Sequence, residues 1–253
     1  MNDTAASESD PKPNGGLVAI SVFTALALAI LIGVGFWQLQ RLTWKSGLIA
    51  QISERIAAAP VPLETVEAAY GKGEDIRFRR VSLTGVYEHE NELHLYSILK
   101  GRQGWRAITP FRHGDNELLL VDRGFVPEEN KLSATRKDGL PSGEVRISGN
   151  VRTHPEQKGA FTPDNQPEIN KWFWYDLTNM LGAVTDKKNT KSSVFFVQLD
   201  TPDHTAQWPR AVKVSPKLTN NHLGYALTWF GLAITLAGVY VAYVMAWRRR
   251  RIM

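Results

Sequence analysis

The chain has 253 residues, 43% of them hydrophobic, with a formal net charge of +5 and no cysteine. The absence of cysteine excludes thiolate metal sites, disulfides and cysteine nucleophiles. Four arginines near the C-terminal end supply +4 and the first sixteen residues −2, so about +3 remains over residues 40–247. That charge is spread without a basic patch, so the composition does not indicate nucleic acid as a partner.

Two apolar stretches, residues 17–39 and 223–247, are long enough to cross a bilayer, and neither contains a charged residue. A helix needs roughly 20 residues for that crossing. The first stretch is read as an uncleaved anchor rather than a signal peptide, because its end, GFWQLQR, offers no small-residue cleavage site. We therefore expect a membrane protein with one transmembrane helix near each end.

The orientation is predicted from the arginine cluster at 248–251, which would be retained on the cytoplasmic side. The charges around the first stretch favour the opposite orientation, because the residues before it are mainly acidic and Arg41 and Lys45 follow it. We give the larger arginine cluster more weight. The acidic leader lacks the arginines of a mitochondrial transit peptide and favours a bacterial inner membrane. The expected division is a cytoplasmic leader (1–16), a first span (17–39), an amphipathic helical extension (40–59), a periplasmic β-rich domain (60–221), a second span (222–247) and a basic cytoplasmic tail (248–253).

The region between the spans changes from helical to alternating periodicity after Pro60 and Pro62, since proline ends a helix. A short helix is expected over 63–70 and another up to about 184, separated by a surface loop at 153–170 and followed by an exposed connection at 185–193. Glycine and asparagine punctuate the alternating runs, as hairpins require, at Gly101, Gly104, 114–116, Gly143 and 149–150. The prediction is a mainly antiparallel β domain, a small barrel or a sandwich, with short helices and strands at 81–87, 93–95, 118–126, 145–151, 195–199 and 211–214.

His222 stands at the mouth of the second apolar stretch, where an imidazole is a candidate ligand for a metal or a haem iron. On a helix, residues three and four apart share a face. One such face combines small and aromatic side chains that would admit a flat macrocycle: His222, Tyr225, Ala226, Trp229 and Ala233. From the first stretch, Trp37 is a candidate wall of the site, and Arg41 and Lys45 are candidate partners for propionates. The alternative is that these rings are only interfacial anchors.

Glycines recur every seven residues at 224, 231 and 238, which predicts a face where another helix approaches closely, and Gly33 and Gly35 would answer from the first span. In the β domain, Asp122 and Arg123 are expected to form structural hydrogen bonds rather than to act in catalysis. The remaining histidines are expected to be exposed: His89, His94, His113, His154 and His204. No nucleophile elbow, phosphate loop or dinucleotide fingerprint is present, so we expect no enzyme.

Several motifs together resemble the surfeit locus protein family of cytochrome c oxidase assembly factors. They occur in the family's order along nearly the whole chain: GFWQLQRLTWK (35–45), RRVSLTGVY (79–87), LLLVDRGFVP (118–127), GNVRTHPEQKGAFTPDN with NKWFWYDL (149–177) and NNHLGYALTWFGLA (220–233).

The resemblance implies a role in maturing a haem-copper oxidase, by holding haem a and presenting it to the catalytic subunit. It implies haem a synthase and the oxidase catalytic subunit as partners beside membrane lipid, and it places His222 where the family has its proposed axial ligand to the haem iron. The glycine face would then contact either the first span or an oxidase helix. A cofactor-free scaffold that stabilises an oxidase assembly intermediate remains the alternative.

Overall fold

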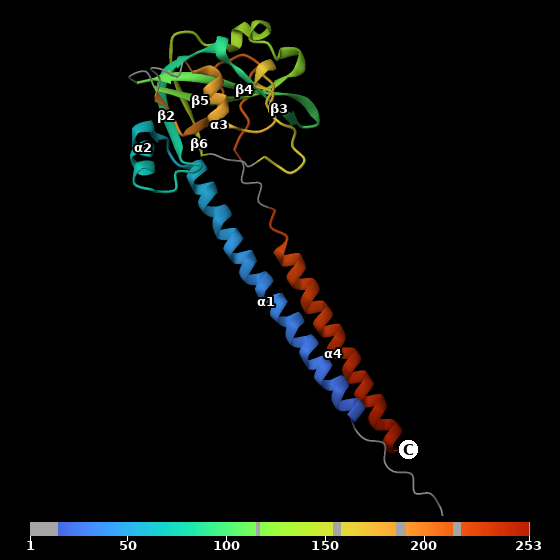
Figure 1. Ribbon diagram of the computed structural model, residues 1–253. Coiled ribbons are helices and arrows are strands. Elements are labelled where there is room, and N and C mark those ends of the chain that lie inside the picture. The colour runs from blue at the N-terminus through green and yellow to red at the C-terminus, as the bar shows by residue number, and fades with distance from the viewer. Residues whose placement is uncertain (1–14, 115–116, 154–157, 186–190, 215–218, 253) are drawn as a thin grey trace, which may run out of the picture. The chain divides into compact units, whose positions relative to one another are not determined.

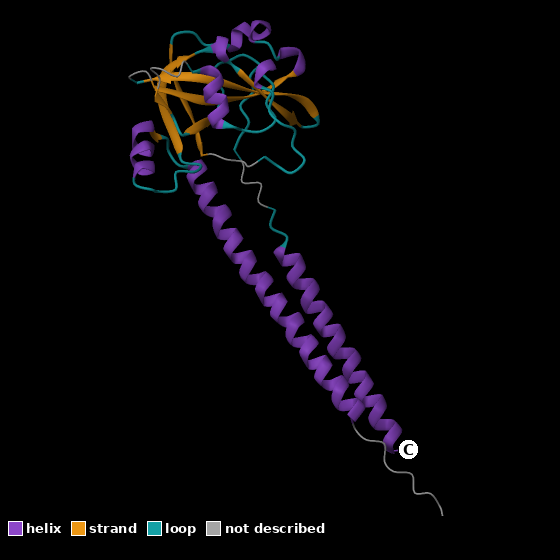
Figure 2. Cartoon of the chain, viewed as in Figure 1, coloured by secondary structure: helices purple, strands orange, loops and turns teal. Residues whose placement is uncertain are grey.

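The computed structural model describes residues 15–114, 117–153, 158–185, 191–214 and 219–252, and the chain divides into two compact units. One unit is a helix pair formed by the two ends of the chain, Met1–Ala50 and Lys217–Met253, and the other is a β domain, Gln51–Pro216. Figure 1 shows the path of the chain through both units, and Figure 2 shows that the strands belong to the β domain.

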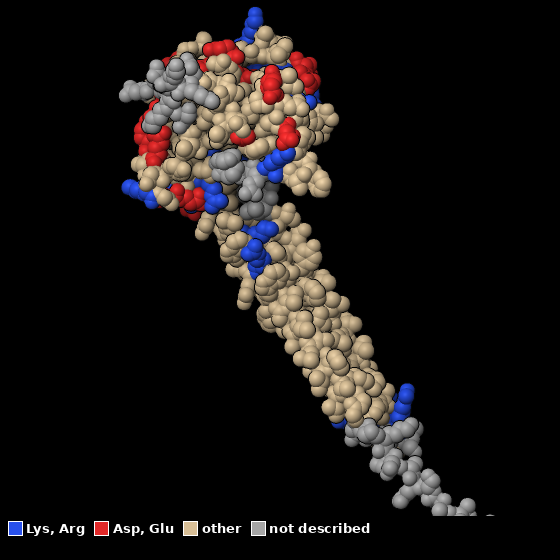
Figure 3. All heavy atoms as spheres, viewed as in Figure 1, with Lys and Arg blue, Asp and Glu red and all other residues tan. Residues whose placement is uncertain are grey.

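The helix pair consists of α1 (Gly15–Ala57) and α4 (His222–Ile252), which lie side by side and antiparallel in Figure 1. Large apolar side chains point outward from both helices; Phe23 and Ile234, for example, are each 74% exposed. Figure 3 shows the same pattern as an uncharged surface with basic groups near its two ends. By length and composition, both helices are able to cross a membrane.

Helix α1 continues without a break through the stretch predicted as an amphipathic extension. It ends at Ala57, just before Pro60 and Pro62, whose missing N–H groups and ring geometry prevent further helical turns. The boundary between the two units falls at Ala50, so the last turns of α1 belong to the β domain.

The β domain contains a closed ring of five strands, because β2 pairs with β6, β6 with β8, β8 with β5, β5 with β4, and β4 again with β2. Three further strands extend the sheet from β2, β4 and β5. The described strands are β1 (Val61–Pro62), β2 (Arg80–Tyr87), β3 (Leu93–Leu99), β4 (Arg102–His113), β5 (Glu117–Pro127), β6 (Glu144–Thr153), β7 (Lys191–Ser192) and β8 (Phe195–Leu199).

The interior of the ring is one apolar cluster to which all five strands contribute alternate residues, such as Leu83, Phe111, Leu119, Ile147 and Val197. Helix α2 (Leu63–Gly71) adds Leu63, Val66 and Ala69 to this cluster. Helix α3 (Leu177–Val184) packs against the opposite face of β5 and β8 through a second cluster. Of the two predicted alternatives, a small barrel or a sandwich, the closed ring of strands is a small barrel.

Three features of the β domain differ from the sequence prediction. The sheet is mixed, because β8 runs parallel to β5. Strand β4 was not predicted. Its middle, residues 104–111, is buried at every position but Arg106 and contains Pro110, and its register shifts at a bulge after Ala107, so no clean alternation is visible. The strand expected at 211–214 is wrong, because a side-chain hydrogen bond from Gln198 to the Val212 carbonyl (2.8 Å) holds that segment instead of a ladder.

The two predicted short helices are confirmed as α2 and α3. The hairpin turn predicted at Gly101 is also confirmed: Lys100 and Gly101 both have positive φ, as a two-residue turn between β3 and β4 requires. The predicted loop and connection lie partly outside the described residues, which lack 154–157 and 186–190.

Candidate functional site

His222 is the first residue of α4, and its ring contacts the facing helix. The Nδ1 atom lies 2.7 Å from Oε1 of Gln38 on α1. A carbonyl oxygen only accepts hydrogen bonds, so Nδ1 carries the proton and donates it. Among the described residues this is the ring's one hydrogen bond, and it leaves the Nε2 lone pair directed away from the bond to α1.

Close packing of the two helices sets this contact. Gly35 is the buried glycine of α1, and a Cβ atom there would lie 2.6 Å from Cε1 of Phe230. The Phe230 ring also meets Phe36 edge to face, with 5.5 Å between centroids. Gln38 follows Gly35 by three residues and so lies on the same face of α1. At the other end of the pair, the Ser21 and Tyr240 hydroxyls are 2.6 Å apart.

The residues expected to share one face of α4 with His222 do not all face the same way in this packing. Ala226 and Ala233 are buried (1% and 6% exposed), so the two small residues face α1 and do not form an open slot. Tyr225 is 56% exposed and lies on the outer side, while Trp229 is intermediate. Room for a flat macrocycle is therefore not provided at the alanines.

Of the predicted α1 residues, Trp37 directly precedes Gln38, and Arg41 and Lys45 follow it within two helical turns. The Arg41 guanidinium lies 4.0 Å from the ring centroid of Trp44, and the Lys45 ammonium donates to the Thr219 carbonyl just before α4. Trp37 is 55% exposed. Trp37, Arg41 and Lys45 thus lie on the helix that His222 contacts, but in the described residues its ring bonds to Gln38 and not to them.

The glycine prediction is confirmed at Gly35 only. A Cβ atom at Gly33, Gly224, Gly231 or Gly238 would meet nothing within 4 Å. The heptad glycines of α4 are exposed and do not pack on α1 within the described pair. The reason is geometric: α4 presents the face of Ala226, Phe230 and Ala233 to α1.

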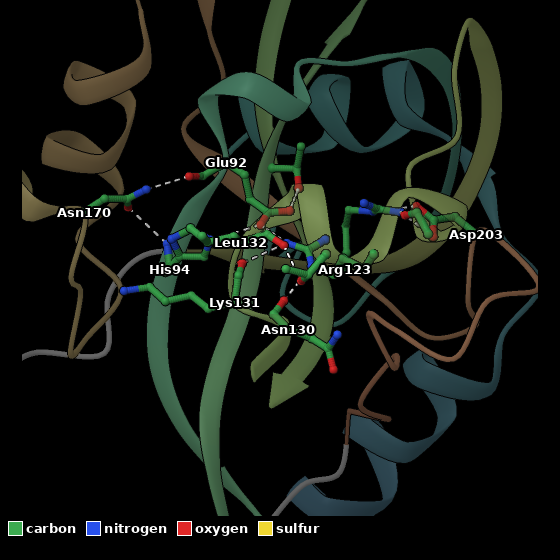
Figure 4. A network of polar contacts seen from close by, with 12 residues as sticks. Glu92, His94, Arg123, Asn130, Lys131, Leu132, Asn170 and Asp203 are labelled. Atoms are coloured by element: carbon green, nitrogen blue, oxygen red, sulfur yellow. Dashed lines mark hydrogen bonds and ion pairs between the residues drawn. The ribbon is translucent and has the colours of Figure 1, made fainter. Parts of the chain in front are cut away.

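A second group of polar side chains lies in the β domain, around Glu92 (Figure 4). Its carboxylate accepts hydrogen bonds from Thr109 Oγ1 (3.2 Å) and Arg136, and lies 3.1 Å from Nε2 of His94. The Glu92 carbonyl accepts a bond from Asn170 Nδ2 at 2.7 Å. Burial acts to raise the pKa of Glu92, but the bond from His94 and the Arg136 charge outweigh it and lower that pKa.

Asp122 and Arg123 bond to different partners rather than to each other. Asp122 accepts from Arg106 Nε (2.6 Å) and from the Tyr175 hydroxyl (2.5 Å). Arg123 is fully buried and donates to both carboxylate oxygens of Asp203, at 2.8 and 3.1 Å. These bonds fit the expectation that Asp122 and Arg123 have a structural role. They tie β5 to Tyr175, which is 53 residues after Asp122, and to Asp203, which is 80 residues after Arg123.

The expectation that the histidines are exposed is wrong for His94 and His204, whose side chains are 10% and 5% exposed. His89 and His113 are partly buried, and His154 lies outside the described residues. Burial lowers the pKa of His89 and His204. Among the described residues, no three His, Cys, Asp or Glu side chains gather as metal ligands.

The sequence patterns did not identify Gln38, the residue that hydrogen-bonds the ring of the predicted ligand. The only signal was its place in GFWQLQR on the side of the first span that carries Gly35.

Comparison with known proteins agrees with the family resemblance seen in the sequence motifs, and it does so along most of the chain. The model of the SURF1 family matches residues 25–234. Surfeit locus protein 1 of Mus musculus is 31% identical over 226 residues, which cover 83% of this chain and 71% of the mouse protein. The SURF1-like protein of Monosiga brevicollis is 34% identical, covering 82% and 81%. A bacterial SURF1-like protein, from Rickettsia felis, is 28% identical, covering 90% and 95%. The chain therefore belongs to the SURF1 family.

Proposed function

We propose that this chain is an assembly factor for a haem-copper cytochrome c oxidase, which holds haem a through His222 and presents it to the catalytic subunit. Membership of the SURF1 family supports the assembly role. The two long apolar helices support a site at a membrane boundary. Haem a is the cargo here, received from haem a synthase, and the proposal assigns no catalysed reaction to the chain itself.

The observation that carries the proposal is the bond between His222 Nδ1 and Gln38 Oε1. Histidines that bind iron or zinc use one ring nitrogen and hold the other in a hydrogen bond, which fixes the ring and its tautomer. His222 has the hydrogen bond of such a ligand on one ring nitrogen. A histidine that only anchors a helix at an interface has no need of a second helix to orient its ring.

The surroundings supply the other groups that a haem needs. Trp37 and Tyr225 expose aromatic surface near the level of His222, and Arg41 and Lys45 bring two positive charges for propionate groups. Iron in the cargo accepts a lone pair, and a neutral imidazole provides one. The apolar helix surfaces beyond Tyr225 suit the long hydrocarbon tail of haem a.

For localisation we propose a bacterial inner membrane, with both helices crossing it and the β domain in the periplasm. The arginine cluster at 248–251 supports a cytoplasmic C-terminal end. His222 then stands on the periplasmic side. Reporter fusions after residue 253 and within the β domain test this orientation; a periplasmic C-terminal reporter contradicts it.

The main test is an absorption spectrum of the full chain, purified in detergent from cells that make haem a. We expect a haem spectrum in the wild type and its loss in His222→Ala, because the alanine has no lone pair for iron. Asn221→Ala, at the neighbouring exposed position, is the matched control and keeps the spectrum. An unchanged Soret band in His222→Ala contradicts the proposal.

The cofactor-free scaffold is favoured by one observation, the open face of Gly224, Gly231 and Gly238, since small residues let a partner helix approach closely. A scaffold predicts co-purification with the oxidase catalytic subunit from cells in which haem a synthesis is blocked. Haem delivery predicts that this association requires haem a or His222. The two functions are thus separated by one pull-down in two strains.

A further inference from the structure

We infer that Gln38 is the positioning residue for His222, and that its neutral amide makes the imidazole a ligand that releases its cargo readily. This inference rests on the proposed function. It adds a residue from the opposite helix and a reason for its chemical type.

The first step is the tautomer. Because Gln38 presents Oε1, a pure acceptor, at 2.7 Å from Nδ1, the ring proton is held on Nδ1. Nε2 is then the unprotonated nitrogen. An apolar side chain in place of Gln38 would leave the proton free to move between both nitrogens and the ring free to turn.

The second step is the rigidity of the glutamine. Gln38 lies one turn beyond Gly35, where the absence of a Cβ lets α1 approach the Phe230 ring. Close approach at Gly35 brings the two backbones near enough for a glutamine to reach across. Just before His222, the Lys45 ammonium donates to the Thr219 carbonyl and Asn220 Nδ2 donates to Ser46 Oγ at 3.0 Å. Hydrogen bonds to α1 therefore hold the residues on one side of the contact, and the packing of Phe230 at Gly35 holds those on the other.

The third step is the strength of the ligand. A carboxylate bonded to Nδ1–H pulls the proton and makes the imidazole a stronger donor to a metal, whereas a carbonyl oxygen fixes the ring with less effect on its basicity. A neutral group also avoids placing a charge at a bilayer boundary. A permanent haem site benefits from the stronger ligand, but a carrier has to give its haem away.

The test uses the full chain in detergent, with hemin, ferric protoporphyrin IX, as the probe. Affinity is measured by Soret titration, release by transfer of hemin to apomyoglobin, and donor strength by the midpoint potential of the bound iron. The variants are Gln38→Leu, which removes the acceptor, and Gln38→Glu, which keeps an acceptor and adds charge. Gln40→Leu and Gln40→Glu are matched controls, because Gln40 is exposed on another side of the same helix.

We expect Gln38→Leu to bind hemin about 10-fold to 100-fold more weakly, the usual effect of removing a group that orients a ligand. Gln38→Glu should restore the affinity, lower the midpoint potential and slow the transfer to apomyoglobin. Both Gln40 variants should match the wild type. A role in helix packing alone would weaken binding in Gln38→Leu without the shift in potential in Gln38→Glu.

The outcomes separate the two claims. Hemin binding that is lost in His222→Ala but has the same affinity, potential and release rate in both Gln38 variants overturns the inference and leaves the proposed function standing. Binding that is unchanged in His222→Ala, or absent from the wild type, overturns both.

Discussion

The helix pair and the β domain place their polar groups in opposite ways. In α1 and α4 the outward surface is apolar, and the contacts between the helices include a few neutral hydrogen bonds, such as those at His222 and Tyr240. In the β domain the outside is charged, and ion pairs such as Arg123 with Asp203 lie inside. Each unit thus suits a different solvent: the first has an outer surface that lipid would solvate at low cost, whereas the second buries its apolar residues from water.

This difference teaches where function and stability reside. A buried ion pair loses much of its attraction to desolvation, but breaking it leaves an uncompensated charge, so it fixes one arrangement of the chain. Apart from the Lys45 ammonium, which donates to the Thr219 carbonyl, the described bonds of the helix pair join neutral groups and lie near its ends, where a ligand can compete for them. We therefore expect substitutions in the β domain to affect folding and substitutions near His222 to affect haem.

The largest expected effect is that of Gly124→Ala in β5. Gly124 has a φ of +119°, and a Cβ atom would lie 2.1 Å from the Arg210 carbonyl oxygen. Strain and a backbone clash together should cost about 3 kcal/mol or more. The measurement is thermal unfolding of the full chain in detergent, followed by near-ultraviolet circular dichroism of the β domain and far-ultraviolet signal of the helices.

Gly101→Ala is the matched control, because its φ of +80° is strained for alanine but nothing lies within 4 Å of the new atom. Its cost should be about 1 kcal/mol. If Gly124→Ala lowers the helical signal as much as the β-domain signal, the two units do not fold separately and the comparison fails.

A smaller effect is expected on acidification. Burial lowers the pKa of His89 and His204, so the unfolded chain binds more protons than the folded one once the pH falls through the ordinary histidine value of about 6.5. Stability of the β domain should therefore fall from pH 7 to pH 5. Below about pH 4, protonation of Glu92 and Asp203 should lower the stability of the β domain further, because the lowered pKa values of both carboxyl groups reflect bonds to charged partners.

The helix pair sharpens this experiment, since its residues 15–50 and 219–252 contain no carboxylate side chain. The melting temperature of the β domain should drop with pH while the helical signal persists. His204→Gln should flatten the curve above pH 5. A β-domain melting temperature that stays constant from pH 7 to pH 5 contradicts the assignment of neutral buried histidines.

The smallest expected effect is that of Tyr240→Phe. It removes one hydrogen bond to Ser21 and should destabilise the helix pair by about 0.5–1 kcal/mol, as interhelical bonds in membranes do. Unfolding by sodium dodecyl sulfate, followed by helical circular dichroism, measures it. Tyr243→Phe is the control, because Tyr243 is 41% exposed. Equal stability of Tyr240→Phe and wild type would show that packing alone holds the pair.

Local patterns in the sequence predicted the helices and most strands. The end of α1 follows from Pro60 and Pro62, and β2 follows from strict alternation. The ring closure was beyond such patterns, because it depends on pairs such as β5 with β8 that are far apart in the chain. Periodicity also favoured a strand over 211–214, where side-chain bonds prevail.

The candidate site was predicted in part for the same reason. The start of an apolar stretch identified His222, but its partner Gln38 is 184 residues away, and pairing across that separation is set by helix packing. The burial of His94 and His204 was missed because their neighbours Glu92 and Asp203 are buried through Arg136 and Arg123, which come from other elements.

The position of β8 in the ring has a consequence for synthesis of the protein. β8 is the last described strand of the chain, yet it lies between β5 and β6 and is paired with both. Until residues 195–199 have left the ribosome, β5 and β6 have no neighbour on that side and the apolar interior stays open to water. The ring can therefore close only after its last described strand has been synthesised, and until then its apolar residues need protection from water.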